Sequence, residues 1–372
     1  MAEFRLLQDR DKEQASALWQ ECFGDSDGLC RWFMREQWNG EYSVAAFEGE
    51  RPVSMIHGRP YTLSIRGRET PAVIMCGVAT APEYRHRGLM RRCMELFERN
   101  AREKGANVLF QSPVDFKIYE WCMQYPSSAS AIITSKKAQG TRGCRYAEDS
   151  PCCEGFAEEL LIVYERIMEG YSGRVVRSAE DMRSVLRGHA ADGGRLVRYI
   201  KEGRTRGYAL YFDYEGQISS IEFMAEGRAA AGMVSFLGAK GRGKKLSLRG
   251  PAGLGAVRLP ACFKADWADT TAMAALNVPA LLRGLAGFND VTVEVEDSVI
   301  PENNGVFAFD GERTSSPADI KLDSGRLMQL LSGYMDIIQL EGEGRVRVLS
   351  RRAADMLAER LPALPCFTAE EY

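Results

Sequence analysis

The stretch TAPEYRHRGLMRRCMEL, from Thr80 to Leu96, is the part of the sequence that decides the expected fold. It follows the apolar run VIMCGVAT, which is typical of a buried strand. Pro82 ends that strand, three basic residues and a glycine follow, and a long amphipathic helix is expected from about His86 to Lys104. Backbone N–H groups at a helix start are unpaired and carry positive potential, so the turn suits an anion such as a diphosphate.

The side chains of the turn also favour an anion. Arg85 and Arg87, with His86 when it is protonated, add positive charge, and Gly88 lets the backbone approach a ligand closely. Cations at a helix start oppose the helix dipole, which is unfavourable unless a bound anion offsets them. The alternative is a solvated helix start whose basic residues have no ligand, and the turn by itself leaves that alternative open.

The composition limits the classes of protein to consider. A chain of 372 residues with 45% apolar and 27% charged residues is ordinary for a soluble protein of two or three domains. The formal net charge of -3 argues against a nucleic-acid binder, which needs a basic excess. No apolar run is long enough for a membrane span, and the charged start lacks a signal peptide's apolar segment. We therefore expect a cytoplasmic protein with neither a membrane span nor a nucleic-acid partner.

The cysteines do not suggest a metal site. The 10 cysteines form no C-x-x-C pair, and only 3 histidines are available to complete a site with them. No metal is therefore expected, and without an export signal the thiols are expected to be reduced.

A second basic stretch, GAKGRGKK from Gly238 to Lys245, fits the spacing of a nucleotide-binding P-loop. Lys245, however, stands where that loop needs a hydroxyl to bind Mg²⁺, and LSLRG after it is typical of a strand rather than a helix. A solvated basic loop is expected here.

The remaining patterns divide the chain into three units: 1–140, 141–272 and 273–372. The first alternates strands and helices, and the polar stretch 136–156 is expected to be a linker. The second is mixed α/β, with strands expected in GYALYFDYEGQISSIEFMA, in KKLSLRG and in GAVRLP (255–260). The third begins with a helix entered through Asn277 and Pro279, followed by two strands and further helices.

The spacing Arg85-x-x-Gly88-x-Met90 resembles the pyrophosphate-binding signature Q/R-x-x-G-x-G/A of GNAT-type N-acetyltransferases, with Met90 in place of the last small residue. The strand before it, the helix after it and the strand NVLFQS that follows give the same context. The resemblance implies that the turn holds the diphosphate of acetyl-CoA and that the preceding strand lies along the pantetheine arm. The residues implied are Val78, Ala79, Thr80, Arg85, His86, Arg87, Gly88, Leu89 and Met90.

Four stretches resemble, more narrowly, the enhanced-intracellular-survival (Eis-type) acetyltransferases: GVATAPEYRHRGLMRR, SPVDFKIYEWCMQY, LNVPALLRGL and LPCFTAEEY. The second departs from that family at Gln124-Tyr125, which lacks the glycine of the family's Gly-Tyr and lies one residue later. The resemblance implies an N-terminal GNAT fold, a second GNAT-like domain and a C-terminal sterol-carrier-protein-like α+β domain. It also implies a homo-oligomer, hexamers being known in that family.

By this resemblance the chain is expected to transfer acetyl from acetyl-CoA directly to a primary amine of an aminoglycoside-, polyamine- or lysine-like acceptor. Tyr119 is implied as the general acid, since a phenol with a pKa of about 10 can protonate the leaving thiolate; a core tyrosine is the alternative. The terminal carboxylate of Tyr372 is implied as the general base. Because a carboxylate is a weak base, orienting the amine or relaying its proton through water are alternatives, as is a disordered tail.

Other functions and residues stay open at this point. The chain fits a non-catalytic protein that binds acyl-CoA or an apolar ligand, and it fits a transferase of longer acyl chains. His57 is a candidate for the acceptor pocket, although a strand histidine with no role is the simpler interpretation. The aromatic residues of the early helices are candidates for a cleft wall: Trp19, Trp32, Phe33 and Trp38. Cysteines near the turn are expected to be buried hydrophobic residues rather than acetyl carriers.

Overall fold

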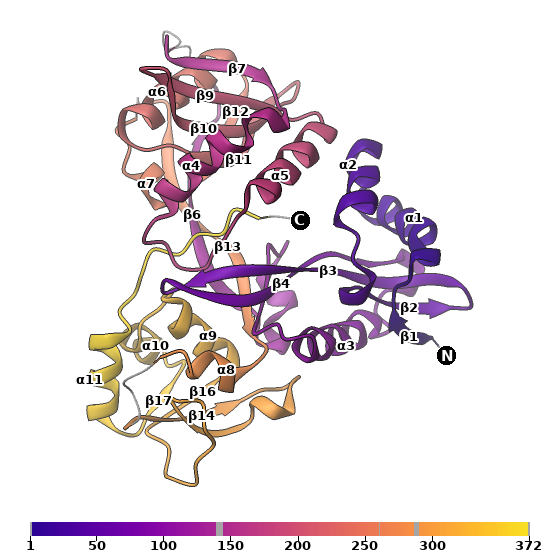
Figure 1. Ribbon diagram of the computed structural model, residues 1–372, viewed down its shortest axis with the longest axis vertical. Helices are drawn as coiled ribbons and strands as arrows, with labels where there is room; N and C mark the ends of the chain where they lie inside the picture. The colour runs from indigo at the N-terminus through magenta and orange to yellow at the C-terminus, as the bar shows by residue number, and fades with distance from the viewer. Residues whose placement is uncertain (1, 139–143, 260, 286–289, 371–372) are drawn as a thin grey trace.

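The computed structural model describes residues 2–138, 144–259, 261–285 and 290–370. Figure 1 shows three bodies, with strands β6 (Tyr125–Ser135) and β13 (Lys264–Ala275) running between the first two. The expectation of a mixed α/β fold is confirmed.

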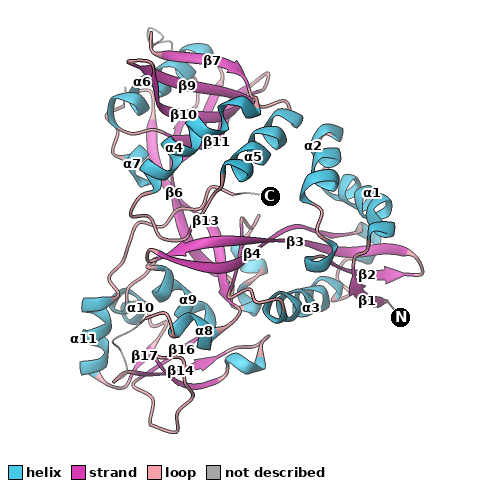
Figure 2. Cartoon of the chain, in the orientation of Figure 1, coloured by secondary structure: helices cyan, strands magenta, loops and turns pink. Residues whose placement is uncertain are grey.

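The amino-terminal body is a twisted sheet with helices on both faces (Figure 2). Its strands are β1 (Glu3–Leu6), β2 (Val44–Glu48), β3 (Arg51–Ile65), β4 (Arg68–Thr80) and β5 (Val108–Gln111). Its helices are α1 (Lys12–Phe23), α2 (Asp27–Trp32) and α3 (Leu89–Glu103). The first four strands are antiparallel neighbours, whereas β5 is parallel to β4. Alternate residues of β2 face opposite helices, since Val44 packs with the α3 side and Phe47 with the α1 side.

Helix α3 follows the basic turn, as the sequence predicts. Its buried face includes Cys93, Met94, Phe97 and Ala101, a spacing of three or four residues that matches the helical period. The helix begins three residues later than predicted, because Gly88 before it has a left-handed φ of 74° and cannot continue a helix. No helix in the described part of the chain is long and apolar enough to cross a lipid bilayer.

The middle body carries a sheet in the order β6, β12 (Lys245–Gly250), β11 (Gln217–Met224), β10 (Arg204–Asp213), β9 (Arg195–Lys201) and β7 (Ala147–Pro151). Its helices are α4 (Ala157–Met168), α5 (Ala179–Ala191), α6 (Gly227–Lys240) and the short α7 (Ala252–Gly255). The strands predicted around the Tyr214–Gly216 turn and in KKLSLRG are confirmed. The P-loop-like stretch is only partly the solvated loop expected, because residues 238–240 end α6, residues 241–244 form a turn and Lys245 begins β12.

Two predictions for this body are wrong. The stretch GAVRLP is not a strand over its described residues: Gly255 ends α7, and the Val257 N–H donates to the Leu254 carbonyl, which closes a turn. Pro260 lies outside the described residues. The expected linker over 136–156 contains strand β7, because antiparallel pairing with β9 from Ala147 to Pro151 provides hydrogen-bond partners that composition does not reveal.

The first two bodies share one continuous sheet. Strand β13 pairs with β5 through Ala272–Ala275 and with β6 through Lys264–Met273, so it lies between strands of both bodies. It also crosses the expected unit boundary after residue 272. The division into units at 140 and 272 stays a prediction.

The carboxy-terminal body has a four-stranded sheet in the order β15 (Gly305–Ala308), β14 (Thr292–Glu296), β16 (Ile320–Asp323) and β17 (Arg347–Val348). Its helices are α8 (Val278–Leu282), α9 (Ser324–Ser332), α10 (Ile337–Gly342) and α11 (Arg351–Arg360). The predicted start of α8 is confirmed, because Asn277 caps it by accepting the Ala280 N–H at 3.2 Å. The hydrophobic core of the carboxy-terminal body is continuous with apolar residues of β3, β4 and β5, such as Leu63, Ile74 and Phe110.

Candidate active site

Strands β4 and β5 separate towards the basic turn. They pair only from Ala72 to Ile74 on β4, so the segment from Met75 to Thr80 has no strand neighbour on the β5 side. A bulge opposite β3 lies in the same segment, where Gly77 has φ 56°. A Cβ on Gly77 would lie 2.4 Å from the Trp19 ring, so only glycine fits. The separation exposes backbone groups of β4 to a gap at the centre of the sheet.

A cavity of about 330 Å³ opens at this gap. Its walls come from β4, from the residues after β5, from the α1–α2 region and from the middle body. The lining residues are Trp19, Phe23, Asp25, Leu29, Met75, Cys76, Gly77, Val78, Gln111, Ser112, Pro113, Val114, Tyr119, Asp192, Phe212 and Ile221. We refer to this cavity as the cleft. Val78 and Tyr119 are the predicted site residues that line it.

The basic turn at the far end of β4 has the backbone geometry of an anion site. His86 and Gly88 both have left-handed φ values, 61° and 74°, which fold the chain into a tight concave turn. The first backbone bond of α3 joins the Arg92 N–H to the Gly88 carbonyl at 3.3 Å. Within the described residues, no acceptor is found for the backbone N–H groups of residues 86–91.

The side chains around the turn leave these N–H groups open. Arg85 donates to the Thr80 carbonyl at 3.1 Å and Arg87 to the Glu83 carbonyl at 2.8 Å, so each guanidinium is braced beside the turn while staying exposed. Met90 departs from the family signature, but its half-buried side chain packs on the core beneath α3. A large residue there therefore does not obstruct the turn.

The remaining predicted strand residues serve the sheet with their side chains. Ala79 is buried against the α1 side, and the Thr80 hydroxyl lies 2.9 Å from the Ser54 hydroxyl on β3. Only their backbone is available to a ligand, as the resemblance implies. Leu89, at the first position of α3, packs on the same core as Met90.

Tyr119 lies between two short 3-10 turns and faces the cleft. Backbone bonds from Tyr119 N–H to the Phe116 carbonyl and from Cys122 N–H to the Tyr119 carbonyl hold it, at 3.0 and 3.1 Å. Burial raises the pKa of Tyr119 to about 12. Its hydroxyl has no hydrogen-bond partner among the described residues. A protonated phenol with no competing acceptor is suited to donating a proton.

The cysteines around the cleft are poor nucleophiles. Burial raises the pKa of Cys76, which lines the cleft, and that of Cys93 to about 12, and it raises the pKa of Cys122 further. The thiolate is the reactive form, so these thiols are inert at neutral pH. This agrees with their expected role as buried hydrophobic residues.

From α11 the described part of the C-terminal tail runs between the other two bodies (Figure 1). Tyr372 lies outside the described residues. Its predecessors from Cys366 to Glu370 are all buried, so the alternative of a disordered tail does not hold for them. The Ser112 hydroxyl, on the cleft wall, donates to the Glu370 carbonyl at 3.4 Å. The described tail therefore ends beside the cleft.

A buried ion-pair cluster holds this end of the tail. Arg177 Nε donates to Glu370 at 2.7 Å, and its two terminal nitrogens donate to both oxygens of Glu222 at 2.9 and 2.8 Å. All three side chains are at most 2% exposed. Tyr208 also donates to Glu222, and the Arg177 guanidinium lies over the Tyr164 ring. The cluster joins the tail to the middle body.

The mouth of the cleft combines carboxylates with aromatic walls. Asp25 accepts from the Trp19 indole at 2.8 Å, and Asp192 accepts from the Ser26 hydroxyl at 2.6 Å. Each carboxylate keeps further acceptor capacity. Phe23 and Phe212 line the same cavity. Negative charge beside aromatic faces suits an ammonium group.

His57 does not line the cleft. It lies among the rings of Trp19, Phe33 and Trp38, at centroid distances of 5.7, 5.4 and 5.5 Å. Burial lowers the pKa of His57 to about 3, so it is neutral and structural. Of the aromatic candidates, Trp19 lines the cleft, and Trp32 lines a separate cavity of about 20 Å³.

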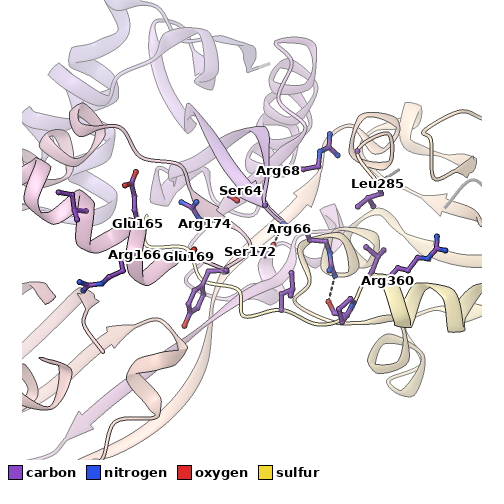
Figure 3. Close-up of a pocket in the computed structure, with 18 residues that line it drawn as sticks. Ser64, Arg66, Arg68, Glu165, Arg166, Glu169, Ser172, Arg174, Leu285 and Arg360 are labelled. Carbon is purple, nitrogen blue, oxygen red and sulfur yellow. Dashed lines mark hydrogen bonds between the residues drawn. The ribbon is translucent and has the colours of Figure 1, made fainter. Parts of the chain in front are cut away.

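A larger groove of about 930 Å³ lies where the three bodies meet (Figure 3). Neither Tyr119 nor a residue of the basic turn is among those that line it. At its centre Arg66 donates to the carbonyls of Leu330, Leu331 and Pro362, at 3.0, 3.0 and 2.9 Å. The guanidinium therefore ties the β3–β4 hairpin to the carboxy-terminal body. We interpret this groove as a structural junction.

Sequence reasoning missed several residues that line or support the cleft: Asp25, Gln111, Arg177 and Asp192. Asp25 follows the end of α1, and the aromatic residues that precede it are a signal by which the sequence could have indicated it. The others come from separate segments, and no local pattern marks them. Their association depends on how the two bodies meet.

Comparison with known proteins agrees with this architecture. Residues 3–121 match the family described as acetyltransferase (GNAT) domain, and residues 278–365 match the sterol carrier protein domain. The chain thus carries a GNAT domain at its amino end and a sterol-carrier-protein-like domain at its carboxy end, as expected. No curated protein sequence matches the chain.

Solved structures resemble it over the full length of both chains. They include a conserved protein of unknown function from Enterococcus faecalis V583, described as a probable N-acyltransferase (17% identity, TM-score 0.80). Others are Eis1 from Mycobacterium abscessus (19%, 0.74) and a GCN5-related N-acetyltransferase from Anabaena variabilis ATCC 29413 (13%, 0.81). At these identities the likeness shows a shared fold.

Proposed function

We propose that this protein is an acetyl-CoA-dependent N-acetyltransferase of the Eis type that acetylates primary amines directly. The observation that carries the proposal is the separation of β4 from β5, which leads from an open anion turn to a cleft containing Tyr119. Diphosphate at the turn and a pantetheine arm along Val78–Thr80 would direct the thioester into that cleft. Its acidic, aromatic mouth at Asp25 and Asp192 favours a cationic acceptor.

The chemistry follows from these positions. A neutral amine attacks the thioester carbonyl carbon, the C–S bond breaks, and the electron pair leaves on sulfur. Tyr119 protonates that thiolate, and the proton lost by the amine passes to the terminal carboxylate of Tyr372, directly or through water. Tyr119 is then reprotonated from solvent, giving an amide and free coenzyme A.

Two further expectations remain proposals. A homo-oligomer agrees with the resemblance stated above, and a cytoplasmic location with the sequence composition. Light scattering of the purified protein would measure the subunit number. Neither is needed for the reaction at the cleft.

Coenzyme binding and turnover test the function directly. Titration calorimetry with acetyl-CoA should give saturable binding, and thiol release should increase with primary amines. Replacing Arg85 and Arg87 together by glutamine should weaken acetyl-CoA binding about tenfold or more, since each charge-assisted bond contributes about 1.5–3 kcal/mol. The salt dependence of binding should fall as well.

Arg99→Gln, on the exposed face of the same helix α3, is the matched control and should bind acetyl-CoA as the wild type does. Equal affinity of the double variant and the control would remove the turn from coenzyme binding. Binding without thiol release on any amine would favour an acyl-CoA-binding protein, and release only with longer acyl-CoA would favour a longer-chain transferase.

The terminal carboxylate has its own test. Extending the chain by a few residues beyond Tyr372 should lower kcat about 100-fold or more, because it moves the proposed base, while acetyl-CoA binding persists. The same extension placed before Met1 serves as the control. Full activity of the C-terminally extended protein would exclude the carboxylate from the mechanism.

A further inference from the structure

A buried hydrogen-bond chain leads from helix α3 to the cleft. Gln111, at the end of β5, donates from Nε2 to Gln124 Oε1 at 2.5 Å, and Gln124 donates from Nε2 to Glu98 Oε1 at 2.9 Å. The three residues are 3%, 0% and 2% exposed. Gln111 lines the cleft, whereas Glu98 lies on the buried face of α3. The chain therefore ends at the proposed reaction site.

The order of donors and acceptors gives this chain a direction. When Glu98 is ionised, its carboxylate can only accept, so Gln124 must turn its NH₂ group towards Glu98 and its carbonyl oxygen towards Gln111. Gln111 must then donate a hydrogen bond from its NH₂ group to Gln124. The side-chain oxygen and the second N–H of Gln111 remain, and because Gln111 lines the cleft, this oxygen is the acceptor that it can offer there.

We propose that the side-chain oxygen of Gln111 accepts an N–H hydrogen bond from the acceptor amine, and that Gln124 and Glu98 position it. This inference rests on the proposed acetyl transfer and extends it to the choice of nucleophile. A primary amine has a second hydrogen to donate while it loses the first, whereas a hydroxyl group does not. The contact also stabilises the positive charge that forms on nitrogen as it attacks.

A purely structural role explains the chain less well. Burying three polar side chains costs free energy that apolar residues of similar volume would not, so the chain needs a purpose beyond packing.

The charged groups around Glu98 affect the pH at which Glu98 ionises and thereby fixes the orientation of the two glutamine amides. Burial raises the pKa of Glu98 to about 8, the Gln124 hydrogen bond lowers it, and the charges of Asp297 and Glu95 raise it. The Cys122 thiol, also near Glu98, stays protonated at neutral pH because burial raises its pKa. Below that pKa a protonated Glu98 can donate a hydrogen bond, which lets the side-chain amides of Gln124 and Gln111 rotate to the opposite orientation. Above that pKa the side-chain oxygen of Gln111 faces the cleft.

Gln111→Met tests the contact, because it keeps the volume and removes the acceptor. We expect kcat/KM for spermidine to fall about 10- to 100-fold, with acetyl-CoA affinity and thiol release to water unchanged. Gln329→Met is the matched control: Gln329 is a buried glutamine of α9 that donates to the Pro126 carbonyl and accepts from Arg326 outside the cleft, and its loss should leave kcat/KM within about twofold. A folded Gln111→Met enzyme with wild-type kcat/KM would overturn the proposal.

Binding separates this proposal from the proposed function. Titration of spermidine into the protein loaded with coenzyme A should show weaker binding for Gln111→Met, even if the wild type does not turn over. Wild-type turnover with no effect of Gln111→Met refutes only the Gln111 contact. A wild type that neither binds nor acetylates spermidine or any other primary amine refutes both.

Glu98→Gln tests the positioning role through a pH profile. The ratio of variant to wild-type kcat/KM should fall as pH rises through about 8, because only the wild type gains a fixed direction there. A constant ratio from about pH 6.5 to pH 9, with both proteins folded, would remove Glu98 from the positioning role.

Discussion

Tyr119→Phe is expected to lower kcat about 100- to 1000-fold while leaving the dissociation constant for acetyl-CoA nearly unchanged. The variant keeps the ring that packs under the cleft and removes only the proton donor. Burial keeps the pKa of this phenol at about 12, so the wild-type hydroxyl is protonated throughout the working range. Initial rates of thiol release with a saturating amine, together with calorimetric titration, measure both quantities.

A neighbouring tyrosine provides the control. Tyr125 is half-buried at the start of β6, and its hydroxyl reaches Asp323 at 3.4 Å rather than the cleft. Tyr125→Phe should therefore retain kcat within about twofold. If Tyr119→Phe behaved in the same way, the proton for the leaving thiolate would have to come from another group.

Arg177→Met is expected to lower the free energy of unfolding by about 3–5 kcal/mol, because it leaves Glu222 and Glu370 buried without their partner. The loss concerns more than one contact, since the guanidinium uses three of its nitrogens on these two carboxylates. Urea unfolding of wild type and variant at neutral pH gives the difference directly.

Two comparisons make this prediction specific. Arg183→Met removes a partly exposed arginine of α5 that pairs with two exposed glutamates, and it should change stability little, because solvated pairs contribute little. Adding Glu222→Gln to Arg177→Met should recover part of the lost stability, since one uncompensated charge is gone. Equal stability of Arg177→Met and wild type would show that the cluster does not hold the tail.

The Arg177 cluster also connects stability with catalysis. Glu370 precedes the end of the chain by two residues, and its carbonyl contacts Ser112 on the cleft wall. Arg177→Met should therefore reduce kcat more than acetyl-CoA affinity, because the turn that we propose holds the coenzyme lies on another element. Protease cleavage of the tail, faster in the variant, would report its release independently.

The sequence by itself determined the local elements around the turn. A proline that ends a strand, a left-handed glycine and an apolar spacing of three or four residues act over some twenty neighbouring positions, so β4, the turn and α3 were predictable. The helix cap at Asn277 and the motifs that indicated the GNAT and sterol-carrier-protein domains at the two ends of the chain also depend on neighbouring residues. The exceptions are short segments. GAVRLP was predicted as a strand but forms a turn after α7, and residues 147–151 were predicted as linker but form β7 by pairing with β9.

Only the tertiary structure decided the composition of the cleft. The residues that line it, such as Asp25, Gln111 and Asp192, lie far apart in the sequence, and β13 inserts between β5 and β6 to bring their bodies together. Burial then gave Glu98, Tyr119 and His57 pKa values that their residue types do not predict. Hydrogen bonds within a turn depend on adjacent residues, whereas desolvation and charge pairing depend on whichever distant segments the folded chain packs around a group.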